Sequence, residues 1–164
     1  MKVVNAFFLA CAALAAHSLP ATACSRWATA NRDIGSLDAP IAAVCANAGR
    51  NSAEIFIHCR AVKGKAGFGL RLSRSVVLKG RKAGAPPRRV VLTFASGNRR
   101  SRLTMTLDRA DKRYVALQLR SHPVYAMIVK GKRLRIRRGR KGVPTTFSLA
   151  GAGKAVRKVM KMCQ

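Results

Sequence analysis

The sequence predicts a mainly β fold, an antiparallel sandwich or barrel-like sheet with an amphipathic α-helix at the C-terminal end. From residue 53 onward, apolar and polar residues alternate in short runs, the period of two that is typical of strands with one buried face. Turn residues separate these runs, which favours antiparallel neighbours joined by hairpins. From Ala152 the spacing changes to that of an amphipathic helix.

The N-terminal residues have the pattern of a secretory signal peptide. Lys2 precedes an apolar run over residues 3–16, and Ala21, Thr22 and Ala23 form a small-residue cleavage signal. The apolar run is shorter than the roughly 20 residues that a membrane-spanning helix needs. We therefore expect residues 1–23 to be a signal peptide and residues 24–164 to form a single β-rich domain that is periplasmic or secreted.

Four cysteines remain after such a cleavage, and an even number suits disulfide bonds in an oxidising compartment. They are Cys24, Cys45, Cys59 and Cys163. Of the three possible connectivities, we expect Cys45 with Cys59, which closes a local loop, and Cys24 with Cys163, which ties the chain ends together. In the alternative, Cys24 carries the lipid of a bacterial lipoprotein and one thiol stays unpaired.

The elements before residue 80 are the least regular. Residues 40–46 form an Ala-rich apolar stretch that predicts a short helix, with a loop held by a disulfide as the alternative. Residues 54–59 predict a strand, and residues 64–69 a glycine-rich turn. Residues 69–79 predict a second strand, with these apolar side chains on one face: Leu70, Leu72, Val76 and Leu78.

The middle of the chain predicts a hairpin followed by a third strand. Residues 89–95 and 101–107 flank the turn residues Ser96, Gly97 and Asn98. In the second of these strands, Leu103, Met105 and Leu107 face the core, and Arg102, Thr104 and Thr106 face solvent. Residues 114–120 continue the sheet, with Val115, Leu117 and Leu119 expected to point inward.

The remaining elements are short except for the last helix. Residues 123–129 predict one or two helical turns, residues 132–138 a strand with Leu134 and Ile136 inward, and residues 145–149 a last strand. The helix after Ala152 has an apolar face of Ala155, Val156, Val159 and Cys163 and a basic face of Lys154, Arg157, Lys158 and Lys161.

The C-terminal third resembles a known family. Residues 126–136 (AMIVKGKRLRI), residues 147–151 (FSLAG) and a helix that ends in Cys163 are similar to the invasion-associated locus B proteins of alphaproteobacteria. The leader, the cysteines around an early strand and the alternating strands agree with the layout of that family. The resemblance implies a β-rich periplasmic or outer-surface protein without established catalysis, and it carries over no functional residue.

Charge is the strongest functional signal. The chain has 33 Lys and Arg against five Asp and Glu, a formal net charge of +28 at pH 7, and such a surface collects anions. Residues 130–141 are the candidate anion-binding site, with eight basic residues: Lys130, Lys132, Arg133, Arg135, Arg137, Arg138, Arg140 and Lys141. A solvated basic face without a dedicated ligand is the alternative interpretation.

Within that segment, the strand period places Arg133, Arg135 and Arg137 in one row, about 6–7 Å apart. This spacing is close to that of successive phosphates or sulfates on a linear polyanion, and arginine favours bidentate contacts with such groups. Further basic residues are expected to widen the patch: Arg71, Arg74, Lys79, Arg81, Lys82, Arg88, Arg89, Arg99, Arg100 and Arg102.

We therefore expect a non-enzymatic protein that binds an anionic surface polymer or membrane headgroups. Lipopolysaccharide, anionic lipid, a glycan and extracellular nucleic acid are the candidates, the last without sequence specificity because no aromatic stacking platform is evident. No cofactor is predicted, since residues 151–154 lack the glycine and hydroxyl positions of a phosphate-binding loop.

The enzymatic alternative is a small secreted nuclease that uses His58 and His122 as acid and base. No metal site is predicted, because His58 and Cys59 are adjacent and point to opposite faces of a strand. Asp108 and Asp111 are interpreted as turn residues.

Overall fold

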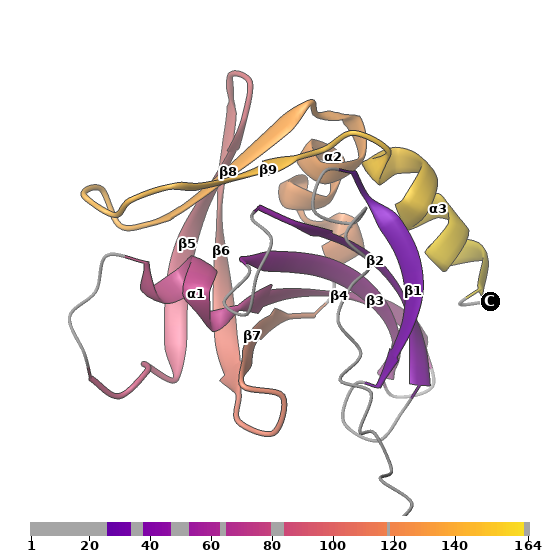
Figure 1. Cartoon of the computed structure of the whole chain (residues 1–164), viewed down its shortest axis with the longest axis horizontal. Coiled ribbons are helices and arrows are strands. Elements are labelled where there is room, and N and C mark those ends of the chain that lie inside the picture. Colours follow the sequence, from indigo (N-terminus) through magenta and orange to yellow (C-terminus); the bar gives the residue numbers. More distant parts are fainter. Residues whose placement is uncertain are drawn as a thin grey trace, which may run out of the picture.

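The computed structural model describes residues 26–33, 38–46, 53–62, 65–79, 84–117 and 119–162. In these residues nine strands form one antiparallel sheet in the order β1-β2-β3-β4-β7-β6-β5-β8-β9, with β1 and β9 at its edges (Figure 1). The prediction of a mainly β fold with a C-terminal helix is confirmed.

The first four strands form a meander: β1 (Ala28–Asp33), β2 (Asp38–Cys45), β3 (Glu54–Val62) and β4 (Lys65–Ser73). The helix predicted for residues 40–46 is wrong, because this stretch is strand β2. Its residues Ile41 to Val44 are all fully buried, so both faces of the strand are covered and no alternation is visible. A short, wholly apolar run of this kind has no period that separates a strand from a buried helix.

Strand β4 begins and ends earlier than predicted. Residues 65–69 belong to the strand rather than to a glycine-rich turn, and the chain leaves the sheet after Ser73 to form helix α1 (Arg74–Leu78). Val76 and Val77 are both buried in that helix. Two adjacent buried residues do not fit a period of two. Arg74 also interrupts the predicted apolar face, because it stands between Leu72 and Val76 at a position where that period requires an apolar residue.

The predicted hairpin is confirmed as β5 (Arg89–Ser96) and β6 (Arg99–Asp108), joined by Gly97 and Asn98. The backbone of Gly97 has a φ of 55°, which glycine adopts at low cost in a two-residue turn. Met105 is buried, and Arg102, Thr104 and Thr106 are exposed, as the alternation indicates.

Strand β7 (Arg113–Ala116) begins one residue before the predicted strand and ends four residues before it. Leu119 is buried as predicted, but in a short 3-10 helix rather than in the strand. Tyr114 and Ala116 face the core, whereas Leu117 is 42 % exposed. The Tyr114 hydroxyl donates a hydrogen bond to the carbonyl oxygen of Pro87 at 2.9 Å, so the buried ring has a partner for its polar end. A slip of one residue exchanges the two faces of a strand, and here the amphipathic tyrosine takes the inner face.

The remaining predicted elements are confirmed. They are α2 (Pro123–Lys130), β8 (Arg133–Arg138), β9 (Thr145–Ser148) and α3 (Ala152–Met162), and a short 3-10 helix η2 (Leu119–Ser121) precedes α2. The buried face of α3 consists of Ala152, Ala155, Val156 and Val159. Figure 1 shows α2 and α3 side by side, with α3 next to β1, and one main apolar cluster joins the sheet to all three helices.

The register of β2 and β3 contradicts the predicted pairing of Cys45 with Cys59. Cys45 lies opposite Glu54, and Cys59 is five residues further along β3. Five residues of strand span about 16 Å, whereas bonded cysteines have Cα atoms less than about 7 Å apart. Both cysteines are disulfide-bonded, but not to each other. The second predicted bond, between Cys24 and Cys163, lies outside the described residues.

Candidate anion-binding site

The predicted arginine row lies on the outer face of β8. Leu134 and Ile136 point into the core and are fully buried, so the alternation directs Arg133, Arg135 and Arg137 outward. Arg133 and Arg135 are exposed, and Arg137 is half-buried. The structure therefore places the three side chains on one surface, at a repeat of about 6–7 Å along the strand.

Two arginines of β6 face this row across β5. Thr93 of β5 lies between Arg102 and Arg137, and Ala95 lies between Arg100 and Arg135. The flanking strands are each about 4.8 Å from β5, so the two arginine-bearing strands are about 10 Å apart. Because Thr93 and Ala95 are small, the centre of the surface is lower than its two sides.

A hollow of about 370 Å³ occupies this position, a volume in the range of small-ligand sites. We call the surface the arginine trough and define it by its floor and walls: Thr93, Ala95, Arg100, Arg102, Arg133, Arg135 and Arg137. It unites the predicted row with two of the residues that were expected to widen the patch.

Other basic residues of the 130–141 segment lie around the trough. Lys130 ends α2 and Lys132 precedes β8, and both line a second hollow beside Arg133. Arg140 lies in the turn after β8 and lines a third hollow with Arg137. Arg138 and Lys141 instead line a separate hollow next to Val77, so these two predicted site residues are not brought into the trough.

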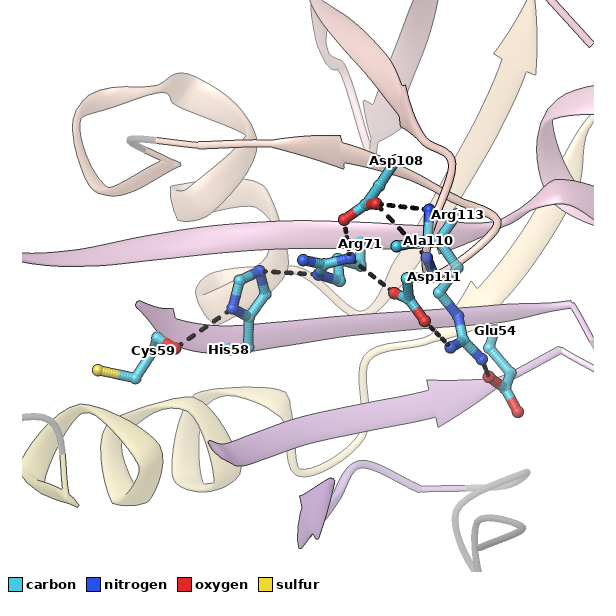
Figure 2. A network of polar contacts seen from close by, with 8 residues as sticks. All are labelled: Glu54, His58, Cys59, Arg71, Asp108, Ala110, Asp111 and Arg113. Atoms are coloured by element: carbon cyan, nitrogen blue, oxygen red, sulfur yellow. Dashed lines mark hydrogen bonds and ion pairs between the residues drawn. The ribbon is translucent and has the colours of Figure 1, made fainter. Parts of the chain in front are cut away.

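Arg71 was predicted to extend the basic patch, and this prediction is wrong. Its side chain is 2 % exposed, and one terminal nitrogen, Nη1, donates to Asp108 at 3.0 Å and to Asp111 at 2.6 Å. Arg113 binds the other oxygen of Asp111 at 3.0 Å and Glu54 at 2.7 Å (Figure 2). Within the described residues, every ion pair involves Arg71 or Arg113.

Asp108 also shapes the turn after β6, as predicted. Its second carboxylate oxygen accepts hydrogen bonds from the backbone nitrogens of Ala110 and Asp111, at 3.1 and 3.4 Å. Partial burial acts to raise the pKa of Asp108, but the hydrogen bond from Arg71 and the turn amides outweigh it, so the pKa lies below its ordinary value of 3.8. Asp108 is thus a carboxylate at neutral pH.

The two histidines of the nuclease alternative both have structural contacts. His58 is 1 % exposed, and its Nε2 accepts from the Arg71 Nε at 3.3 Å while Nδ1 contacts the carbonyl oxygen of Cys59. His122 caps α2, with Nδ1 accepting from the backbone nitrogen of Val124 at 3.3 Å. Neither histidine lines the trough or the hollows at its ends.

The described residues contain no group of three or more His, Cys, Asp or Glu side chains placed to hold a metal ion. Nor do they include a helix with the length and apolar character to cross a bilayer. The ion pairs that Arg71 and Arg113 make with Glu54, Asp108 and Asp111, here called the acidic network, escaped prediction because their members are far apart in the sequence. Arg71 and Asp108 differ by 37 in residue number, and Glu54 and Arg113 by 59.

Comparisons with family models, curated proteins and solved structures gave no match for this chain.

Proposed function

We propose that this chain is an exported, non-enzymatic protein that binds polyanions through the arginine trough. The observation that carries the proposal is a set of five guanidinium groups, four around the central hollow and that of Arg102 in the hollow beside it. None of the five pairs with a described carboxylate. Three of the five acidic residues of the sequence are held by Arg71 and Arg113 instead. The signal-peptide pattern supports an exported site of action.

The arrangement favours an anion for physical reasons. These arginines rise from positions about 6–7 Å apart along a strand and from strands about 10 Å apart. Such spacings are close to the screening length of physiological salt, about 8 Å, so the like charges repel one another. A ligand that carries several phosphates, sulfates or carboxylates relieves this repulsion and accepts bidentate hydrogen bonds. Membrane headgroups, lipopolysaccharide, acidic glycans and nucleic acids all offer such groups.

The test is retention of the protein on immobilised heparin and on lipopolysaccharide as a function of salt. The trough variant changes Arg133, Arg135 and Arg137 to Ser. The matched control, Lys154→Ser with Arg157→Ser and Lys158→Ser, removes the same charge from the exposed side of α3. We expect the trough variant to elute at clearly lower salt than the control. The loss of each arginine contact reduces the number of counterions that are released when the protein binds the polyanion.

Equal elution of the two variants would mean that total charge governs retention, and the trough would not be the site. Circular dichroism spectra and thermal unfolding of both variants test whether the fold is intact. We expect it to be, because all six substituted residues lie at the surface of β8 or α3.

A further inference from the structure

The hollows around the trough are neighbours along the direction of the strands and share lining residues. The central hollow shares Thr93, Arg100 and Arg137 with the hollow next to Arg140. It shares Gly97 and Arg133 with the hollow at the end of α2. From Val91 to Gly97 this path follows β5 for about 20 Å, so the basic surface is long and narrow.

The width of the trough selects a single chain. Its walls rise from strands about 10 Å apart, with one strand as the floor. A DNA duplex is too wide to enter the trough, because its major groove alone is about 12 Å wide. A double helix therefore contacts this surface only with the phosphates of one edge. A single linear polymer has room to lie lengthwise between the arginines of β6 and those of β8.

The lining of the trough disfavours a single-stranded nucleic acid. Among the described residues, no aromatic side chain lines the central hollow or the two beside it. Proteins that bind single strands gain much of their affinity by stacking bases on aromatic side chains, and the described lining of these hollows offers no such contact.

Neutral hydrogen-bonding groups alternate with the charges instead. Thr93 lies on the floor of the central hollow, and Asn98 lines the hollow at the end of α2. Hydroxyl and amide groups both donate and accept hydrogen bonds, which suits the hydroxyls of a sugar, whereas guanidinium groups only donate.

From these observations, and on the basis of the proposed function, we infer that the ligand of the arginine trough is an acidic glycan. One chain of several sugar units lies along β5, and the arginines of β6 and β8 bind its sulfate or carboxylate groups. The ends of the chain reach Arg140 on one side and the end of α2, at Lys130 and Lys132, on the other.

The experiment measures the affinity of the mature protein for heparin-derived oligosaccharides of increasing length, by fluorescence anisotropy in 150 mM salt. Oligothymidylates with the same number of charges and a DNA duplex are the comparison probes. We expect heparin fragments to bind at least about tenfold more tightly than oligothymidylates of equal charge, because the latter gain no stacking here. Affinity should rise with fragment length and level off once the trough is filled.

Two variants test the lengthwise placement. Arg135→Ser, in the central hollow, should weaken the binding of fragments of every length. The double variant Lys130→Ser with Lys132→Ser should weaken only the fragments long enough to reach the end of α2. Equal weakening of short and long fragments by both variants would overturn the lengthwise placement.

The possible results separate the two proposals. Oligothymidylate or duplex binding that equals or exceeds heparin binding, and that is lost in the trough variant, would overturn the glycan assignment while polyanion binding at the trough stands. Binding of every probe that is unchanged in the trough variant would overturn the proposed function as well.

Discussion

At Arg71, one buried guanidinium group joins three parts of the chain. Its Nε contacts His58 on β3, and its Nη1 contacts Asp108 at the end of β6 and Asp111 in the following turn. Arginine has no acceptor, so His58 Nε2 must accept, and the contact of Nδ1 with the Cys59 carbonyl then fits a proton on Nδ1. His58 and Arg71 thereby join β3 to β4 through a buried hydrogen bond between side chains.

The pH dependence of stability follows from Asp108. Its pKa in the folded protein is lowered, so the unfolded chain takes up the proton first as the pH falls, and the stabilisation is lost as the pH drops through the folded pKa. We expect Asp108→Asn to lower the free energy of unfolding at pH 7. We also expect the difference from the wild type to shrink between about pH 5 and pH 3.

Urea unfolding at a series of pH values measures this difference. Curves for Asp108→Asn and the wild type that run parallel across the whole pH range would contradict the assignment of this carboxylate. Asparagine keeps the oxygen that accepts from Ala110 and Asp111, so the turn itself is retained.

At the scale of single residues, the sequence predicts which face of a strand a side chain occupies better than it predicts which residues that side chain contacts. The alternation correctly orients Arg133, Arg135 and Arg137, because a strand with a buried Leu134 and Ile136 leaves them no other side. The same reasoning counts Arg71 as a surface charge. Its burial depends on carboxylates from β6 and the following turn, and a local period does not contain that information.

The elements differ in how strongly their own sequence determines them. The β5–β6 hairpin, β8, β9 and α3 each have a clear period and turn residues at their ends, and they are predicted correctly. Strand β2 is covered on both faces, and β4 gives way to α1 without a turn signal. In these two places contacts with neighbouring elements decide the conformation, and local propensity is overridden.

The packing of β3 against β4 provides a test at this scale. Gly69 lies opposite His58, and a Cβ added at Gly69 would overlap the imidazole ring at Nε2. Because that ring is buried, we expect Gly69→Ala to lower the free energy of unfolding by about 1–3 kcal/mol, the usual cost of overpacking.

The matched control is Gly84→Ala, where an added Cβ meets no atom within 4 Å. This exposed position should change stability by less than about 0.5 kcal/mol. If the two substitutions prove equally mild in urea unfolding, His58 moves freely and the close approach of the two strands is not a constraint.

For the whole molecule, the distribution of charge matters more than its sum. The formal net charge is +28, and the described ion pairs gather Glu54, Asp108 and Asp111 around two arginines on one part of the sheet. The composition predicts an anion-collecting protein. It does not predict that the arginine trough would form on β5, β6 and β8 away from the described carboxylates, because that outcome depends on the strand order.

Self-repulsion of this surface should make stability rise with ionic strength. We expect the melting temperature at pH 7 to increase by a few degrees when sodium chloride is raised from low to physiological concentration, because salt screens like charges. The variant with Arg133, Arg135 and Arg137 changed to Ser should gain less. A melting temperature that falls with salt would show that attractive ion pairs dominate the surface electrostatics.

The isolation of the acidic network also has a kinetic consequence. Arg71 and Arg113 hold three carboxylates away from the trough. Under the proposed function, an arriving anion would therefore displace water and small counterions there and break no described ion pair. We then expect electrostatic steering to raise the association rate toward the diffusion limit at low salt. Differences in residence time, rather than in capture rate, would then distinguish one polyanion from another.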